Sequence, residues 1–185
     1  MTKRWLVTAF GQDRPGLVAG VTQVLYQLGC NLEDSAMTRL EGEFTIMLIC
    51  SSPSAFTLER LTRAFAPLQR RLRLVIHVKP LTRRESLAPK RRGRPYLISV
   101  YGADRPGIVA RISDVLARAG VNITDVHTHR SAAGAGSREP SLYLLILEVE
   151  LPAKRARSSL ESRLKEAAKR LGVEVGLRPS EAVVL

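Results

Sequence analysis

Apolar and polar residues follow one another along the chain in short blocks that predict strands and helices. The segments 4–10 and 96–102 are rich in aromatic and β-branched residues and run into glycine, as strands do. Gly29 and Gly120 fit the left-handed position that closes a helix. Before them, apolar residues recur at helical spacing in two sets: Leu17, Val21, Val24 and Leu28, and Ile108, Ile112, Val115 and Ala119.

The rest of each half continues with two strands, a helix and a last strand. In the first half, the segments 30–40 and 44–50 flank Glu41-Gly42-Glu43, which predicts a hairpin. Helical spacing returns between Ser52 and Arg71, and alternation over 71–80 predicts a half-buried strand. The second half repeats this order with a strand over 142–151, a helix near 153–171 and a strand near 172–178.

This order of elements is that of the ferredoxin-like split βαβ fold. We therefore expect an α+β protein with two tandem ferredoxin-like βαββαβ domains, each an antiparallel four-stranded sheet with its helices on one face. The predicted limits are 1–80 for the first domain, 81–94 for a linker and 95–185 for the second domain. In this topology Asp13 and Asn31 lie at opposite ends of the same helix.

An internal repeat supports two copies of one domain. Residues 11–34 and 102–125 share 12 identities in 24 positions without a gap, at a constant offset of 91 residues. Aligning Phe44 with Leu142 gives an offset of 98, which assigns seven extra residues to a Gly/Ala-rich hairpin tip at 131–140. A solvent loop is the favoured interpretation of this insertion, and a lid or partner-contact loop is the alternative.

Composition and charge limit the environment and the partners. The 185 residues are 45% hydrophobic and carry a net charge of +12. Basic residues are densest over 79–95, a segment with seven basic residues and one acidic residue. Cys30 and Cys50 lie in apolar stretches, so we expect no disulfide framework and a cytoplasmic protein. No apolar run approaches the roughly 20 residues needed to span a bilayer, so no membrane association is expected.

The residues give little support to an enzyme. His127 and His129 lie two apart on a predicted strand and share a face, but no cluster of cysteine or acidic residues accompanies them at metal-ligand spacing. The serines lack a nucleophile-elbow context, and neither cysteine has a nearby histidine. We therefore predict no catalytic residue, no metal and no cofactor.

The loops "GQDRPG" (11–16) and "GADRPG" (102–107) are the strongest candidate for a binding site. Proline suits the first turn of a helix, and glycine lets a ligand approach the backbone. The free amides of that turn and the helix dipole suit a carboxylate. Asp13 either caps the helix or accepts a hydrogen bond from an ammonium group. A helix start without a ligand is the alternative.

The loop, the Gly-x-Asn turns at 29–31 and 120–122 and the strand order resemble the ACT domain, a regulatory module that binds small molecules of amino-acid metabolism. The resemblance covers nearly the whole chain as two tandem copies. It implies a ligand held between the loop of one copy and the turn of the other. Two sets of residues would face each other in this way: Asp13, Gly16, Leu17 and Val18 with Asn122, and Asp104, Gly107, Ile108 and Val109 with Asn31.

Two ACT-type copies without a further domain resemble the glycine cleavage system transcriptional repressor family. This implies a non-catalytic protein that senses glycine or a similar amino acid and modulates transcription through a protein partner such as a transcription factor. Two alternatives stay open: direct nucleic-acid binding through the basic linker, and a regulatory subunit of a metabolic enzyme. Exposed sheet edges also allow a homodimer.

Overall fold

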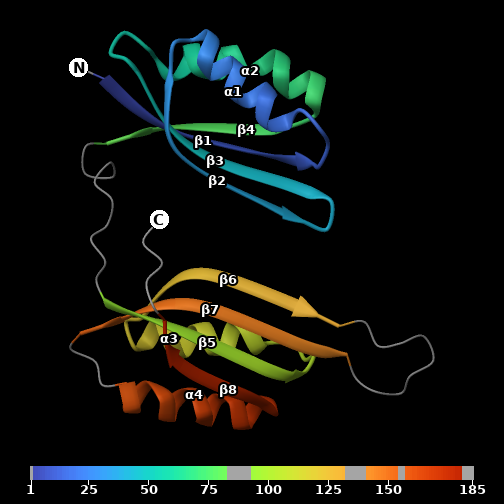
Figure 1. The fold of residues 1–185 in the computed structure, drawn as a ribbon, viewed down its shortest axis with the longest axis vertical. Coiled ribbons are helices and arrows are strands. Elements are labelled where there is room, and N and C mark those ends of the chain that lie inside the picture. The colour runs from blue at the N-terminus through green and yellow to red at the C-terminus, as the bar shows by residue number, and fades with distance from the viewer. Residues whose placement is uncertain (1, 83–92, 132–140, 154–156, 181–185) are drawn as a thin grey trace. The chain divides into compact units, whose positions relative to one another are not determined.

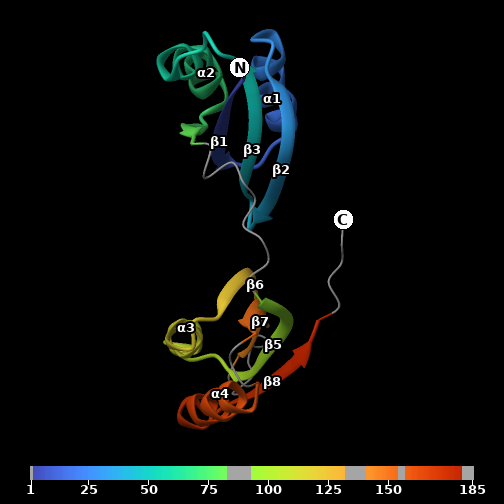
Figure 2. The ribbon, with the colours of Figure 1, turned by 90° about the vertical axis from the view of Figure 1, so that its left-hand side faces the viewer.

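The chain forms two compact units, Met1–Ala88 and Pro89–Leu185. The computed structural model describes residues 2–82, 93–131, 141–153 and 157–180. Each unit is a four-stranded antiparallel sheet with two helices on one face (Figures 1 and 2). This confirms the expected α+β architecture of two ferredoxin-like domains. Most of the predicted linker, 83–92, lies outside the described residues.

In the first unit, β1 and β3 are the central strands. Asp13 follows β1, and the turn at Glu41 and Gly42 joins β2 to β3 with positive φ angles of 46° and 89°, as the predicted hairpin requires. The strand order across the sheet is β2-β3-β1-β4. The elements are β1 (Thr2–Gln12), α1 (Leu17–Gln27), β2 (Asn31–Leu40), β3 (Glu43–Pro53), α2 (Leu58–Leu72) and β4 (Val75–Leu81).

The second unit repeats this topology with the strand order β6-β7-β5-β8. Even an irregularity is shared: the pairing of β2 with β3 shifts between Leu32 and Asp34, and that of β6 with β7 shifts between Ile123 and Asp125. The elements are β5 (Gly93–Ala103), α3 (Ile108–Arg118), β6 (Asn122–Arg130), β7 (Leu142–Pro152), α4 (Arg157–Leu171) and β8 (Val173–Pro179).

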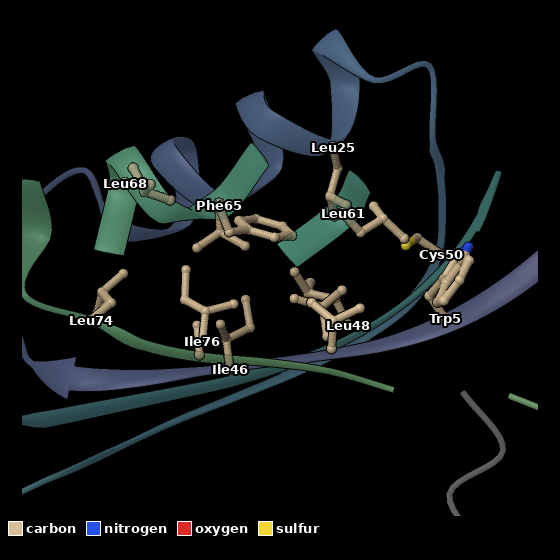
Figure 3. Packing of buried hydrophobic residues seen from close by; sticks show 14 of the residues in the cluster. Trp5, Leu25, Ile46, Leu48, Cys50, Leu61, Phe65, Leu68, Leu74 and Ile76 are labelled. Atoms are coloured by element: carbon tan, nitrogen blue, oxygen red, sulfur yellow. The ribbon is translucent and has the colours of Figure 1, made fainter. Parts of the chain in front are cut away.

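The core of the first unit lies between its helices and its sheet, as Figure 3 shows. Alternate residues of the strands, such as Ile46, Leu48 and Cys50, point toward the helices, as the period of two requires. Leu61 and Phe65 of α2 are fully buried against them. The second unit has a separate cluster of the same kind. Each unit therefore holds its helix starts on a core of its own.

The start of α2 was predicted wrongly. Helical spacing suggested a helix from Ser52, but β3 continues to Pro53, which pairs with Thr2 of β1. The Trp5 indole Nε1 donates a hydrogen bond to the buried Ser52 hydroxyl at 2.8 Å, which holds the strand. The helix begins only at Leu58, where the Thr57 side chain accepts a hydrogen bond from a first-turn amide at 3.3 Å.

The predicted alignment of β3 with β7 was wrong by one residue. Phe44 pairs with Gly11 and Tyr143 pairs with Gly102, so the offset between the two strands is 99 residues and the insertion is eight residues long. Leu142, which the prediction aligned with Phe44, is 41% exposed, whereas Phe44 is buried. A shift of one residue turns every side chain of a strand to the other face, so burial decides the alignment. Positions 132–140 of the insertion lie outside the described residues.

Candidate functional site

Each DRPG segment forms a tight turn that starts a helix. Gly16 has φ 92° and ψ −1°, and Gly107 has φ 94° and ψ −1°. These are the angles of the third residue of a type II turn, which commonly has proline before it. Pro15 and Pro106 therefore precede the helices and lie outside the first turn, where proline was expected. Glycine is required because other residues are strained at this φ.

The first turns of α1 and α3 carry no side-chain cap. In both helices the glycine is the N-cap, and no acidic residue lies in the first turn. The first amides of a helix have no partner within the helix, and the helix dipole adds positive potential there. Such a site suits a carboxylate or a phosphate group. The predicted capping role of Asp13 is wrong, because its side chain does not bond to the helix.

Asp13 instead joins the turn to the β2–β3 hairpin. Its amide donates a hydrogen bond to the Gly42 carbonyl at 2.7 Å, and its Oδ2 atom lies 3.3 Å from Nη1 of Arg39. In the second unit the Asp104 amide bonds to the Ser141 carbonyl at 2.8 Å. Its carboxylate lies 2.9 Å from Nε of Arg130. Each aspartate is therefore held beside the helix start with its carboxylate already paired.

Sequence reasoning missed Arg39 and Arg130. A signal was present, because the two arginines are 91 residues apart, the offset of the repeat. The aligned segments ended at Asp34 and Asp125, five residues short of them. Extending the alignment to the end of the next strand would have shown that both copies have an arginine there as well as the aspartate of the DRPG segment.

Asn31 and Asn122 lie away from these turns. They are the first residues of β2 and β6, opposite Ser51 and Glu150. The whole of α1 or α3 separates each asparagine from the aspartate of its own unit, as predicted. Gly29 and Gly120, with φ 68° and 69°, close the helices before them, also as predicted. The pairing of each asparagine with the loop of the other copy stays a prediction.

Other candidate residues show no catalytic arrangement. His127 and His129 lie exposed on β6, and Nε2 of His127 is 2.9 Å from Oδ2 of Asp125. Within the described ranges, no three histidine, cysteine or acidic side chains come together as metal ligands would. Burial raises the pKa of the Cys50 thiol to about 12, so this thiol stays protonated and is a weak nucleophile at neutral pH.

The helices carry no membrane signal in the part of the chain that the structure describes. None of them combines the length and the apolar character that crossing a bilayer requires.

Comparison with known proteins places this architecture in a family. The ACT domain family matches residues 3–79 and 94–178. The glycine cleavage system transcriptional repressor of Escherichia coli (strain K12) is 30% identical over 185 residues, which cover 97% of this chain and 89% of that protein. A UPF0237 protein of Streptococcus mutans is 32% identical over 74 residues, 40% of this chain and 84% of that protein.

Solved structures resemble this chain over nearly its full length. An unknown protein from Galdieria sulphuraria superposes with a TM-score of 0.78 at 25% identity, covering 98% of this chain and 100% of that one. A protein provisionally assigned as a glycine cleavage system transcriptional repressor has the same fold, with a TM-score of 0.71 at 17% identity, covering 98% and 99%. The chain is therefore a tandem ACT-domain protein and belongs to the family of the glycine cleavage system transcriptional repressor.

Proposed function

We propose that this chain is a non-catalytic regulator that senses a small amino acid, glycine or a similar one, and modulates transcription through a protein partner. One observation carries the proposal. In both units an uncapped helix start follows a glycine near φ 92° and lies beside a fixed aspartate. A site for an anion next to a carboxylate is complementary to the two charges of a free amino acid.

The residues divide between the two ends of the ligand. In the first unit, Gly16 and the amides of Leu17 and Val18 take the carboxylate, and Asp13 takes the ammonium group. Arg39 is largely exposed, so its ion pair with Asp13 is weak. The ammonium group therefore replaces Arg39 at Asp13, or binds Asp13 beside it, at modest cost. The second unit offers the same groups: Asp104, Gly107, Ile108 and Val109.

The asparagines complete the site from another copy of the domain. Asn31 lies at the far end of α1 from Asp13, and Asn122 lies at the far end of α3 from Asp104. A small ligand does not reach both ends of one helix of 11 residues. We therefore assign Asn122 to the ligand of the first loop and Asn31 to that of the second. Ligand binding then favours one arrangement of the copies over others, which changes the surface offered to the partner.

A thermal-shift screen of the full chain tests the sensor. Glycine and the other amino acids are added at millimolar concentration, since a ligand that binds only the folded state raises the melting temperature. Glycinamide and acetate are the matched controls, because each keeps one charged end of glycine and lacks the other. We expect a rise with an amino acid and none with either control. The proposal fails if no amino acid shifts the transition.

The charge of the chain supports a second candidate function. A net charge of +12 with seven basic residues over 79–95 would neutralise several phosphates and give salt-sensitive, sequence-independent binding of nucleic acid. Gel mobility of a duplex DNA fragment with the isolated protein, measured across a salt series, separates the two functions. Tight binding at physiological salt would favour direct nucleic-acid binding over a partner-mediated role.

A further inference from the structure

Two adjoining hollows form one groove between α1 and α2 of the first unit. Their volumes are about 590 Å³ and 400 Å³, and Ala64 of α2 lines both. The groove follows α2 from Thr57 to Arg71, which is about 21 Å at the rise of ~1.5 Å per residue of a helix. It reaches Gly16 at the start of α1, so it begins at the turn proposed to bind the amino acid.

Part of the groove lining, called its floor here, consists of small and aliphatic residues. Val24 of α1 and Ala64, Pro67 and Leu68 of α2 contribute to it. Gly20 brings the two helices close, because a Cβ atom at this position would lie 2.9 Å from Cδ1 of Leu68. No aromatic residue lines either hollow among the residues described. The groove therefore offers packing space for aliphatic side chains.

The two rims differ in charge. On the α2 side, the charged lining residues are Arg60, Arg63 and Arg71 and a single acid, Glu59. Within the described residues, Arg63 and Arg71 take part in no ion pair. The α1 side contributes glutamine, and α1 carries no charged residue along its length. The groove therefore combines an apolar floor with unpaired positive charge along one rim.

The second unit carries charged side chains where the first unit has this surface. At the positions of Gly20, Gln23 and Gln27, offset by 91 residues, α3 has Arg111, Asp114 and Arg118. The last two form an ion pair at 3.0 Å. On α4, offset by 99 residues, Arg163 and Glu166 replace Ala64 and Pro67. The fold alone therefore does not determine the uncharged lining of the groove, because the aligned positions of the second copy hold charged residues.

We infer that the groove docks an acidic amphipathic helix of the regulated protein. Aliphatic residues on one face of that helix would fill the floor, and its acidic residues would meet the arginines. Nucleic acid fits less well, because the groove has no aromatic platform for bases and phosphates gain nothing from an apolar floor. A second copy of this chain, with a net charge of +12, is also disfavoured. The inference rests on the proposed partner-mediated function and adds the chemistry of the partner.

Fluorescence anisotropy of labelled peptides with the full chain tests the inference. The probe is a helical peptide of about 14 residues, matching the length of the groove, with leucine on one face and glutamate on the other. One control replaces glutamate by lysine, and another keeps the composition but scatters the leucines around the helix. A duplex DNA fragment is the third probe. We expect binding of the first peptide alone.

Variants of the chain separate the groove from bulk charge. Arg63→Glu with Arg71→Glu is expected to weaken peptide binding at least about tenfold. The matched control, Arg163→Glu with Lys169→Glu on α4, changes the net charge equally and should leave binding unchanged. Ala64→Arg should weaken binding although it adds positive charge, because it fills the floor. The aligned position of α4 already holds arginine, so a helix of this fold accepts that residue.

Several outcomes would overturn the inference. The first two are that the acidic peptide does not bind and that the α4 control weakens peptide binding as much as the α2 variants do. The other two are that Ala64→Arg binds the peptide more tightly and that the α2 variants change the binding of DNA alone. Circular dichroism and melting of each variant verify that it is folded. The amino-acid thermal shift is measured in parallel on the unmodified chain. A shift without peptide binding overturns the groove alone, whereas no shift with any amino acid overturns the proposed sensor.

Discussion

Asp13 and Arg39 tie the turn before α1 to the end of β2, with 3.3 Å between Oδ2 and Nη1. Asp104 and Arg130 form the equivalent ion pair at 2.9 Å between Oδ2 and Nε. The side-chain exposure of the arginines is 69% in both units, and that of the aspartates is 29% and 27%. Two copies that differ elsewhere thus both have an aspartate–arginine ion pair beside the helix start, through Nη1 of Arg39 and Nε of Arg130. The pair orients the carboxylate that the proposed site uses.

Removing the arginine should barely affect stability. Because the ion pair is exposed, we expect Arg39→Gln to lower the free energy of unfolding by less than about 1 kcal/mol in urea denaturation. Arg130→Gln is the matched variant in the second unit and should behave alike. A loss above about 2 kcal/mol would show that the pair holds the fold together, in contrast to an exposed surface pair.

Substituting Gly16 should cost more. At φ 92° a Cβ atom is strained, so Gly16→Ala is expected to lower the free energy of unfolding by about 1–2 kcal/mol. Beyond the two neighbouring residues, no atom lies within 4 Å of that Cβ position, so we attribute the loss to backbone strain and not to a clash with another part of the unit. Gly16→Asn is the control, because asparagine adopts positive φ more readily and should lose less. Equal losses for the two variants would argue against strain.

The effects of substituting Trp5 and Ser52 on the free energy of unfolding should be coupled, because the two side chains share a buried hydrogen bond. Ser52→Ala leaves the buried indole N–H without its partner and is expected to cost about 1–3 kcal/mol. In a Trp5→Phe background the same substitution should cost at least about 1 kcal/mol less. The double-mutant cycle in urea measures this difference. If the stability losses of the two single variants add up to the loss of the double variant, the hydrogen bond does not couple the two residues.

Stability should fall at alkaline pH because of Cys50. Burial, and then the adjacent Cys30, raise the pKa of its thiol from 9.0 to about 12. The unfolded thiol therefore loses its proton from pH 9 upward, while the folded one keeps it until about pH 12. The contribution of the Cys50 thiol to the free energy of unfolding is complete below pH 9 and decreases above it, by at most about 1.4 kcal/mol per pH unit.

The reference protein for this prediction is the Cys50→Val variant, which lacks the titrating thiol of Cys50. Val149 occupies the equivalent position of β7, so the fold accepts valine there. The difference in unfolding free energy between the two proteins should be constant below pH 8 and change from pH 9 to 11. Parallel curves over the whole range would contradict the raised pKa.

Sequence reasoning was most accurate where the signal is periodic or repeated. Leu17 and Val21 are buried in α1, as their spacing predicts, and the repeat at an offset of 91 identifies both turns. It failed where two local signals compete. Ser52 reads as the start of a helix, but pairing with β1 extends β3 through it. Side-chain preference is a weak predictor beside a ladder of strand hydrogen bonds.

The sequence by itself determined the two-domain α+β fold and the two DRPG turns, because apolar periodicity and a repeat without gaps can be read without knowing any contact. Only the tertiary structure decided what surrounds those turns. Arg39 lies 26 residues from Asp13 in the chain, and Gly20 meets Leu68 through the packing of α1 on α2. Such contacts depend on strand register and helix packing, which are set by the burial of the whole unit and not by any local pattern.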